Sequence, residues 1–336
     1  MSAAATLGRR GRRRSRAQAV TLLQRQGALL ALALLVVIAS LRYDGFLSVY
    51  NVLSVVNTNA AVGLLALGMA FVIMTGGIDL SVGSVLALGS VVAAHASGAG
   101  PLGGLAAGIA AGAAVGLLNG VVITRLGIQP FIVTLATLLG ARGLALSLAD
   151  NRSVSVDFES GFTLVGEGTL LGVQYGIWIL VAAFAVGVVA LRYTRFGRHV
   201  LAIGGNEEAA RLMGLRIDRV KVAVYVLSGA LAGLAGVLLA AQNYGGQPTA
   251  GLGYELSAIA AVVVGGTLLT GGEGSIATTF VGVLLLGLIF NILNFENGEG
   301  VISLSAYWQS VVRGAFLLLV VVLQARLLKR ARAEPG

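Results

Sequence analysis

Long apolar stretches with almost no charge follow one another along this chain, and they limit its fold more than any other feature. A transmembrane helix needs about 20 predominantly apolar residues. By that measure we expect about ten membrane-spanning helices, of which 27–41 and 255–270 are short enough to be tilted, broken or longer than drawn. The predicted spans are 27–41, 51–75, 80–97, 101–124, 128–148, 176–192, 222–242, 255–270, 275–294 and 303–325. The sequence therefore predicts an all-α integral membrane protein.

Composition excludes a water-soluble domain. Of the 336 residues, 57% are hydrophobic and 11% are charged, whereas soluble domains carry roughly 25% charged residues. The 49 glycines fit a membrane protein, because small residues let membrane helices approach closely. The chain has no cysteine, which excludes a disulfide, a thiolate metal site and a cysteine nucleophile.

Basic residues predict the topology. The net charge of +9 comes mainly from an N-terminal arm at 1–26, a central loop at 193–221 and a C-terminal tail at 326–336, which flank or interrupt a transmembrane domain at 27–325. Lys and Arg are retained in cytoplasmic loops, so we expect the central loop and both termini in the cytoplasm. This topology accounts for the positive charge better than nucleic-acid binding does.

The loop at 149–175 has the opposite character. Its ionisable residues are Asp150, Asp157, Glu159 and Glu167 against the single Arg152. Counting spans from a cytoplasmic N-terminus places this loop outside the cell, where acidic residues meet no barrier from the positive-inside rule. The two charged loops therefore predict the same orientation independently.

Two glycine-rich breaks interrupt the apolar pattern: GGIDLSVGS at Gly76–Ser84 and GGTLLTGGEGS at Gly265–Ser275. Related interruptions in the two halves of a chain are typical of internal-repeat transporters, which predicts two inverted-repeat-like halves. As local structure we interpret both breaks as turns between helices, with Asp79 or Ser81 and Ser275 as N-caps. The break residues singled out are Gly76, Gly77, Asp79, Ser81, Gly265, Gly266, Gly271 and Gly272.

The central loop contains a short predicted helix. Residues Glu207 to Met213 are good helix formers, with two acids at the start and Arg211 near the end, as the helix dipole favours. Gly214 then suits a helix stop. We expect an amphipathic helix on the cytoplasmic face, and the residues alone leave open whether it binds a partner or is only a capped surface helix.

Several motifs resemble one family. Glu208-Ala209-Ala210 followed by Gly214 is similar to the loop that permease subunits of bacterial ATP-binding-cassette importers insert into their ATPases. The stretches GGIDLSVGSVLAL, AIGGNEEAARLMGL, YVLSGALAGLAG and ELSAIAAVVVGGTLLTGGEGS resemble the branch that serves ribose, galactose and related monosaccharides, distant relatives of the branched-chain amino acid permeases. Within that branch, TRFGRHVLAIGGN, IQPFIVTLATLLGARG and Ile292–Phe295 most resemble the galactofuranose-type permease. The resemblance covers roughly residues 50–325.

This resemblance implies a translocation subunit of the bacterial inner membrane that works by alternating access. It implies three kinds of partner: a second permease, identical or homologous; cytoplasmic ATPases that bind the ATP and Mg; and a periplasmic or lipid-anchored sugar-binding protein. The implied ATPase-coupling residues are Glu207, Glu208, Ala209, Ala210, Arg211 and Gly214. The two alanines would let the helix seat closely in an ATPase groove, while Arg211 and Arg216 pair with acids of the ATPase.

The chain offers no catalytic or cofactor site of its own. It has no G-x-x-x-x-G-K-[ST] motif, and its only lysines are Lys221 and Lys329. His95 and His199 have no nucleophile and carboxylate in a readable arrangement. The Leu227-Ser228-Gly229 triplet, though similar to an ATPase signature, lies inside an apolar helix. We therefore expect a transport subunit with no ATPase site, no metal and no cofactor.

A pathway for a neutral sugar needs amides, hydroxyls and aromatic rings more than charges. The candidate pathway residues are Asn57, Asn59, Phe131, Thr134, Asn291, Asn294 and Trp308, each of which could instead make an interhelical hydrogen bond or an interface contact. Ionisable residues at membrane depth are functional candidates by default. The candidates are Asp79, Arg142, Glu255, Glu273 and Arg313, and most of them lie near predicted helix ends, which favours capping or interface roles.

Three alternatives to a sugar importer remain. A permease for branched-chain amino acids would need a paired charge or a half-helix N-terminus for the zwitterion, and the GGIDLS stretch favours sugar. A self-sufficient secondary carrier would need coupling acids at mid-depth of the membrane. A membrane scaffold would use the central loop for docking alone.

Overall fold

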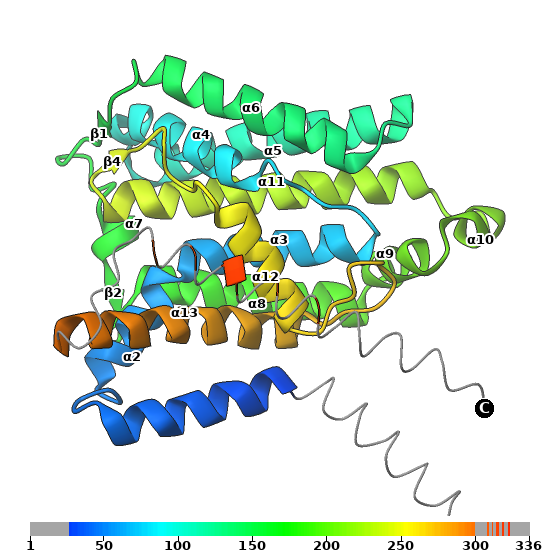
Figure 1. Ribbon diagram of the computed structural model, residues 1–336. Coiled ribbons are helices and arrows are strands. Elements are labelled where there is room, and N and C mark those ends of the chain that lie inside the picture. The colour runs from blue at the N-terminus through cyan, green and yellow to red at the C-terminus, as the bar shows by residue number, and fades with distance from the viewer. Residues whose placement is uncertain are drawn as a thin grey trace, which may run out of the picture.

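The computed structural model describes residues 27–299 and the single positions 308, 311, 314, 315, 318 and 322. Within these residues nearly all regular structure is α-helix (Figure 1), which confirms the predicted all-α membrane fold. The predicted arm at 1–26 and tail at 326–336 lie outside the described residues, and the predicted span at 303–325 lies almost entirely outside them.

The helices are Gly27–Arg42, α2 (Val49–Thr58), α3 (Ala60–Met74), α4 (Val82–His95), η1 (Ser97–Ala99), α5 (Gly100–Leu126), α6 (Pro130–Leu148), α7 (Leu164–Glu167), α8 (Tyr175–Tyr193), α9 (Arg195–Gly205), α10 (Glu207–Leu212), α11 (Ile217–Gln242), α12 (Tyr254–Val264) and α13 (Ile276–Glu299). Four two-residue strands form two antiparallel pairs: β1 (Val154–Ser155) with β4 (Gly245–Gly246), and β2 (Thr169–Leu170) with β3 (Val173–Gln174).

Each predicted span before residue 299 coincides with a helix, but the helices differ in length. Among the described residues five helices are long and apolar enough to cross a membrane, or six if α2 and α3, bent by 48° at Asn59, count as one span. The helices at Gly27–Arg42, α4 and α12 are apolar but shorter. For 80–97 the difference is a correction: α4 has 14 residues, or about 21 Å against a hydrocarbon core of about 30 Å, because the glycine-rich break extends to Ser81.

The core is organised around α11, which packs on α5, α4 and α3. Glycine recurs at every fourth position of α5, at Gly104, Gly108, Gly112, Gly116 and Gly120; the last four meet α11, whereas Gly104 meets the ring of Phe162. A Cβ added at Gly112 would lie 2.8 Å from the backbone nitrogen of Gly233, and one added at Gly120 would lie 2.7 Å from the Cα of Val222. The two backbones are therefore in direct contact, the packing that small residues permit between membrane helices.

The charged loops lie at opposite ends of the bundle. Figure 1 shows α9 and α10 at one end, whereas β1, β4 and α7 lie at the other. The first end carries the basic central loop and the second the acidic loop at 149–175. This separation is the one that the predicted topology requires.

The two glycine-rich breaks meet each other and the end of α9. The Gly272 N–H donates to the Met74 carbonyl at 3.0 Å. A Cβ added at Gly271 would lie 2.8 Å from the Gly76 nitrogen, and one added at Gly204 would overlap the Met74 carbonyl oxygen. We call these five residues the glycine junction. Three chain segments that are remote in the sequence thus touch through bare backbone.

Candidate coupling surface and translocation pathway

The helix α10 forms the tip of the basic loop. Asn206 is its N-cap, since the Asn206 side-chain oxygen accepts from the Ala209 N–H at 2.9 Å. At the other end Gly214 has a positive φ of 81°, and the next residue, Leu215, donates its N–H back to the Ala210 carbonyl at 3.1 Å. This pattern ends helices where glycine adopts the left-handed conformation. The local helix that the sequence predicts is therefore present, while its coupling role stays a prediction.

Two predicted coupling residues contact the chain itself: Glu207, whose side chain stays 43% exposed, and Ala210, which is fully buried and so does not offer the close seat for a partner that was expected of it. The Glu207 carboxylate pairs with Lys221 of α11 at 2.7 Å and with Arg211 at 3.6 Å. Ala210 is fully buried beneath the helix. These contacts fix α10 on α11, so that Glu208 and Arg211 form part of the outer surface.

The outer surface also contains two residues that the sequence analysis missed. Leu212 is 85% exposed and Met213 is 70% exposed, immediately before the terminating glycine. Neighbouring exposed apolar side chains form the kind of surface that proteins present to a partner or to a membrane. The signal was present in the sequence, because these are large apolar residues at the end of a polar segment. We call Glu208, Arg211, Leu212 and Met213 the α10 surface.

The first break contains a buried polar network. Asp79 is fully buried, and its carboxylate accepts from the Ser81 N–H at 3.0 Å, the Ser81 hydroxyl at 2.6 Å and the Ser228 hydroxyl of α11 at 2.9 Å. Asn119 of α5 donates to the Ser81 hydroxyl at 3.1 Å. Within the described residues the Asn119 carbonyl and the buried Tyr225 hydroxyl have no hydrogen-bond partner.

This network corrects the interpretation of the first break as a simple capped turn. Ser81 precedes α4, but its side chain makes no capping hydrogen bond. Asp79 and Ser81 instead join α4 to α5 and α11, because buried polar groups must find partners and the nearest ones lie on those helices. At the second break the expectation fits better, since the Ser275 hydroxyl accepts from the Thr278 N–H at 3.5 Å.

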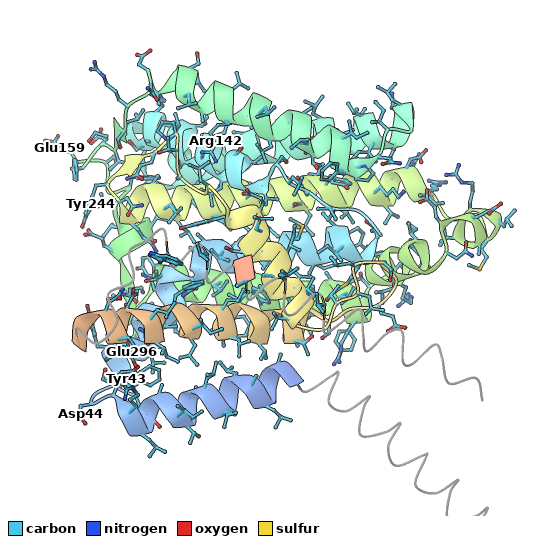
Figure 2. All side chains as sticks on the ribbon, viewed as in Figure 1. Tyr43, Asp44, Arg142, Glu159, Tyr244 and Glu296 are labelled. Atoms are coloured by element: carbon cyan, nitrogen blue, oxygen red, sulfur yellow. The ribbon has the colours of Figure 1, made fainter. Side chains whose placement is uncertain are left out.

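The first turns of α4 and α12 meet inside the bundle. A Cβ added at Gly83 would lie 2.5 Å from a carboxylate oxygen of Glu255, and one added at Gly251 would lie 2.6 Å from the Gly83 carbonyl oxygen. Arg142 of α6 donates to the carbonyls of Pro248 and Ala250 at 2.6 and 2.7 Å. Arg142 lies six residues before the end of α6, about 9 Å along the helix from its C-terminus. Figure 2 shows its label between α6 and α11, on the side of the bundle nearer to β1 and β4. The loop 247–253 before α12 therefore enters the bundle between α6 and α4.

The predicted pathway residues do not form one cluster. Asn57, Asn59 and Asn291 lie around α2, α3 and α13: Asn57 accepts from Gln242 at 3.4 Å, Asn59 donates to the Val55 carbonyl at 2.8 Å, and Asn291 exchanges hydrogen bonds with Asn51 at 2.9 and 3.2 Å. On α6, the buried Thr134 hydroxyl donates to the Pro130 carbonyl at 2.9 Å, whereas Phe131 is exposed on the outer surface. Asn294 and Trp308 are also exposed.

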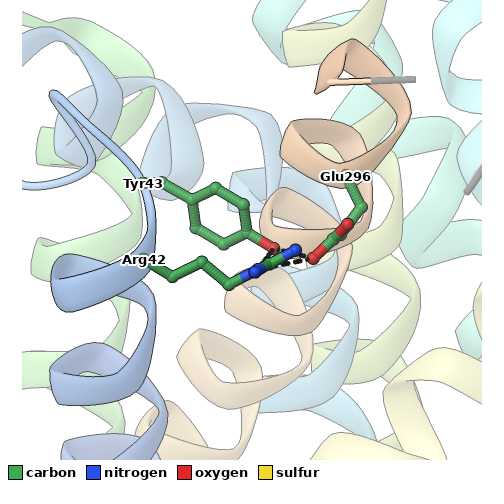
Figure 3. Close-up of polar contacts among 3 residues, drawn as sticks. All are labelled: Arg42, Tyr43 and Glu296. Carbon is green, nitrogen blue, oxygen red and sulfur yellow. Dashed lines mark hydrogen bonds and ion pairs between the residues drawn. The ribbon is translucent and has the colours of Figure 1, made fainter. Parts of the chain in front are cut away.

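A polar and aromatic cluster ties the first helix to α13. The Tyr43 hydroxyl donates to the Glu296 carboxylate, and Arg42 pairs with the same oxygen at 2.9 Å (Figure 3). The Tyr43 ring packs against Phe46 and Phe295, with centroids 6.2 and 5.2 Å away. Figure 2 shows this cluster at the end of the bundle that carries β1 and β4. The cluster therefore fixes the C-terminal end of the first helix to α13.

The acidic loop is closed by a contact to the end of α11. Tyr244 donates its hydroxyl to the Glu167 carboxylate and stacks on Phe158, with ring centroids 5.9 Å apart. The hydrogen bond to Glu167 raises the pKa of Tyr244 above its usual value. Figure 2 shows Tyr244 and Glu159 at the end opposite α10. The loop is thereby folded over the bundle end.

No group of three or more His, Asp or Glu side chains that could hold a metal ion occurs in the described part of the chain. The arrangement instead offers a projecting surface at one end, a folded acidic loop at the other, and two short helices whose first turns meet between them.

Comparison with known proteins identifies the family of the chain. The family model for the branched-chain amino acid transport system permease component matches residues 51–321. The ribose import permease protein RbsC of Bacillus subtilis (strain 168) is 44% identical over 307 residues, covering 90% of this chain and 94% of that protein. The Escherichia coli (strain K12) RbsC is 40% identical over 305 residues, covering 89% and 93%. The L-arabinose ABC transporter permease protein AraH of Azospirillum brasilense is 38% identical over 315 residues, covering 92% and 90%.

No solved structure shows significant similarity to the chain. The family match nevertheless spans most of its length, including both breaks, α10 and the acidic loop. The chain therefore belongs to the family of membrane permease components described as the branched-chain amino acid transport system permease component.

Proposed function

We propose that this chain is the translocation subunit of an ATP-driven importer for a monosaccharide. Its similar relatives are named as permeases for ribose and L-arabinose, so pentoses come first among candidate substrates and ribose first among pentoses. Galactofuranose, which individual motifs favour, is the next candidate. ATP hydrolysis takes place on separate subunits.

The observation that carries this proposal is the α10 surface. It combines exposed apolar side chains, Leu212 and Met213, with exposed charges on a helix fixed to α11 by Lys221. A freely mobile loop could bind an ATPase but would not transmit its movement, because flexible segments absorb displacement. A helix held by a salt bridge and a buried alanine moves together with the helices behind it.

The route from α10 to the membrane interior runs through the glycine junction. The junction joins the last turn of α9 to both breaks, and each break connects to one of the short helices α4 and α12. A shift of α10 is thereby coupled to the meeting point of those two helices. Alternating access then consists of opening and closing this meeting point toward the two sides of the membrane.

The proposed topology has ten spans with both termini in the cytoplasm. In this topology α10 faces the ATPases and the acidic loop faces the periplasm, where a sugar-binding protein delivers substrate. The Arg142 and Glu255 side chains are only partly buried in the described chain. Charges within a membrane need a polar surrounding, which a water-filled pathway shared with a second permease provides.

The proposal is tested by uptake of radiolabelled ribose in cells that lack their own ribose permease and express this chain with its native ATPase and binding protein. The double substitution of Leu212→Ser and Met213→Ser should reduce both uptake and co-purification of the ATPase about 30-fold, the effect of losing roughly 2 kcal/mol of apolar contact. The matched control is Leu126→Ser, since Leu126 is exposed at the end of α5. Equal uptake by the double variant and the control would refute the coupling role.

The same uptake assay distinguishes a sugar importer from two other functions. A permease for branched-chain amino acids would take up labelled leucine or valine, with no competition from ribose. A secondary carrier would move ribose into liposomes without ATP, and the substitutions in α10 would leave that movement unchanged. Labelled galactofuranose and ribose in competition identify the preferred sugar.

A further inference from the structure

A cavity of about 320 Å³ lies where α8 ends and where α9 and α13 begin. Its volume falls within the range of small-molecule sites, about 300–1,000 Å³. It belongs to neither the α10 surface nor the meeting point of α4 and α12. Its position at the end of the bundle that carries the basic loop places it, in the proposed topology, at the level of the inner-leaflet headgroups.

Two arginines contribute the charge of this cavity. Arg192 comes from the last turn of α8 and Arg198 from α9, and both line the cavity. Within the described residues neither guanidinium takes part in an ion pair, since the pairs present there join Arg42, Arg211 and Lys221 to glutamates. Both arginines are exposed and come from adjacent helices, and a guanidinium can bind a phosphate group with two parallel hydrogen bonds.

The rest of the lining is mainly aliphatic. Val188 and Leu191 of α8, Leu201 of α9 and Ile276 of α13 are among the lining residues, and the only hydroxyl among them all is that of Ser275. A site for free phosphate needs polar groups around the anion and gains nothing from aliphatic walls. A phospholipid presents both chemistries, a phosphate for the arginines and acyl chains for the walls.

We propose that this cavity binds the headgroup phosphate of an anionic phospholipid from the inner leaflet. Basic pockets between transmembrane helices on the cytoplasmic side are suited to such headgroups. The bound phosphate bridges α8 and α9 through Arg192 and Arg198, beside the start of α13.

The bridge has a consequence for the coupling segment. The helix α9 leads directly into α10, and its last turn contains Gly204 of the glycine junction. A lipid that holds the first half of α9 against α8 and α13 therefore fixes the base on which α10 stands. The inference concerns lipid binding and is independent of which substrate the chain transports.

The full-length chain, purified in detergent, tests the proposal through its apparent Tm. Added phosphatidylglycerol should raise the apparent Tm, and phosphatidylcholine of the same acyl composition should not. In the double variant Arg192→Gln and Arg198→Gln, half-maximal stabilisation should need about 30-fold more phosphatidylglycerol, since each arginine near an anionic surface contributes a factor of about five in affinity. The matched control is Arg195→Gln, an exposed arginine of α9 that does not line the cavity.

A second variant covers the case in which the double variant folds poorly. Ala277 lines the cavity and is exposed, so Ala277→Phe fills the space and leaves both arginines in place. It should weaken the response to phosphatidylglycerol without lowering the Tm in detergent alone. Native mass spectrometry of the unmodified chain should show retained phosphatidylglycerol that Arg195→Gln keeps and Ala277→Phe loses.

Two results would overturn the proposal. One is an equal response to phosphatidylglycerol in the unmodified chain and in both cavity variants. The other is full stabilisation by inorganic phosphate with no further effect of phosphatidylglycerol, which would identify the cavity as a site for the free ion.

Discussion

Adding one methyl group at Gly204 provides a sharp test of the glycine junction. Gly204 lies in the last turn of α9, and a Cβ there would overlap the Met74 carbonyl oxygen and lie 2.5 Å from the Gly272 nitrogen. Those two atoms are joined by the hydrogen bond that connects the two breaks. The substitution Gly204→Ala therefore places a methyl group against this hydrogen bond.

The expected loss of folding stability follows from these distances. Real Cβ atoms essentially never approach other heavy atoms below 3.0 Å, so α9 must move away from Gly272 by at least 0.5 Å, and farther from Met74. Overpacking of this kind costs about 1–3 kcal/mol, and loss of the backbone hydrogen bond adds about 1 kcal/mol. Alanine returns up to about 1 kcal/mol through its better helix propensity. We expect a net loss of about 2 kcal/mol.

The adjacent glycine supplies the matched control. Gly205 is in the same helical turn, but a Cβ there would meet nothing within 4 Å. Gly205→Ala should leave the apparent Tm unchanged or slightly raised. Gly204→Ala should lower it by about 3 °C, from roughly 1.4 °C per kcal/mol at an unfolding entropy of about 2.1 cal/mol/K per residue. Both are measured in one detergent at one heating rate, because unfolding of a large membrane protein is usually irreversible.

Ribose uptake adds a readout that stability alone does not give. If the junction couples α9 to the breaks, Gly204→Ala should reduce uptake per inserted molecule well below that of Gly205→Ala, measured at a temperature where both remain folded. Indistinguishable Tm values for the two variants would show that the three segments are not packed as described. A lowered Tm with normal uptake would retain the packing and refute its role in coupling.

Three further predictions concern other parts of the bundle. Gly112→Ala should lower the apparent Tm by several degrees because its methyl group meets the α11 backbone, whereas Gly140→Ala on α6, with nothing within 4 Å, should not. Ser228→Ala should destabilise the chain by about 1.5–3 kcal/mol, because it removes a hydrogen bond to the buried Asp79 carboxylate; an unchanged Tm would contradict the network. Tyr244→Phe should reduce the loss of stability at alkaline pH. Because the pKa of Tyr244 is raised, its contribution to folding stability is complete below about pH 10 and is lost above it. Curves of Tm against pH that run parallel for the variant and the unmodified chain would refute this prediction.

Much of the fold could be predicted from local sequence. The apolar runs predicted the helix positions, since a membrane helix depends on composition over about 20 residues. Likewise α10 could be predicted from its ends, because Asn206 and Gly214 act within one turn of the helix that they delimit. The opposite placement of the basic and acidic loops followed from charge alone.

The site depended on contacts that no local pattern contains. Asp79 is satisfied by Ser228, 149 positions away, and the sequence gives no reason to choose that serine among others. Glu207 was predicted to face a partner but pairs with Lys221, because the turn at Gly214 brings α11 back beside α10. The bend at Asn59 was missed because apolar composition continues on both sides of it, and α4 is shorter than the predicted span because the glycine-rich break extends to Ser81.

The backbone contact between α5 and α11 also has a genetic consequence. Every glycine codon has guanine as its first and second base, and any amino-acid replacement caused by a change at either base introduces a Cβ. At Gly108, Gly112 and Gly116 each such replacement meets backbone or side-chain atoms of the neighbouring helices. Every amino-acid replacement by a single-base change at these two codon positions is therefore expected to disturb the contact between α5 and α11, and destabilising alleles should be found at these glycines.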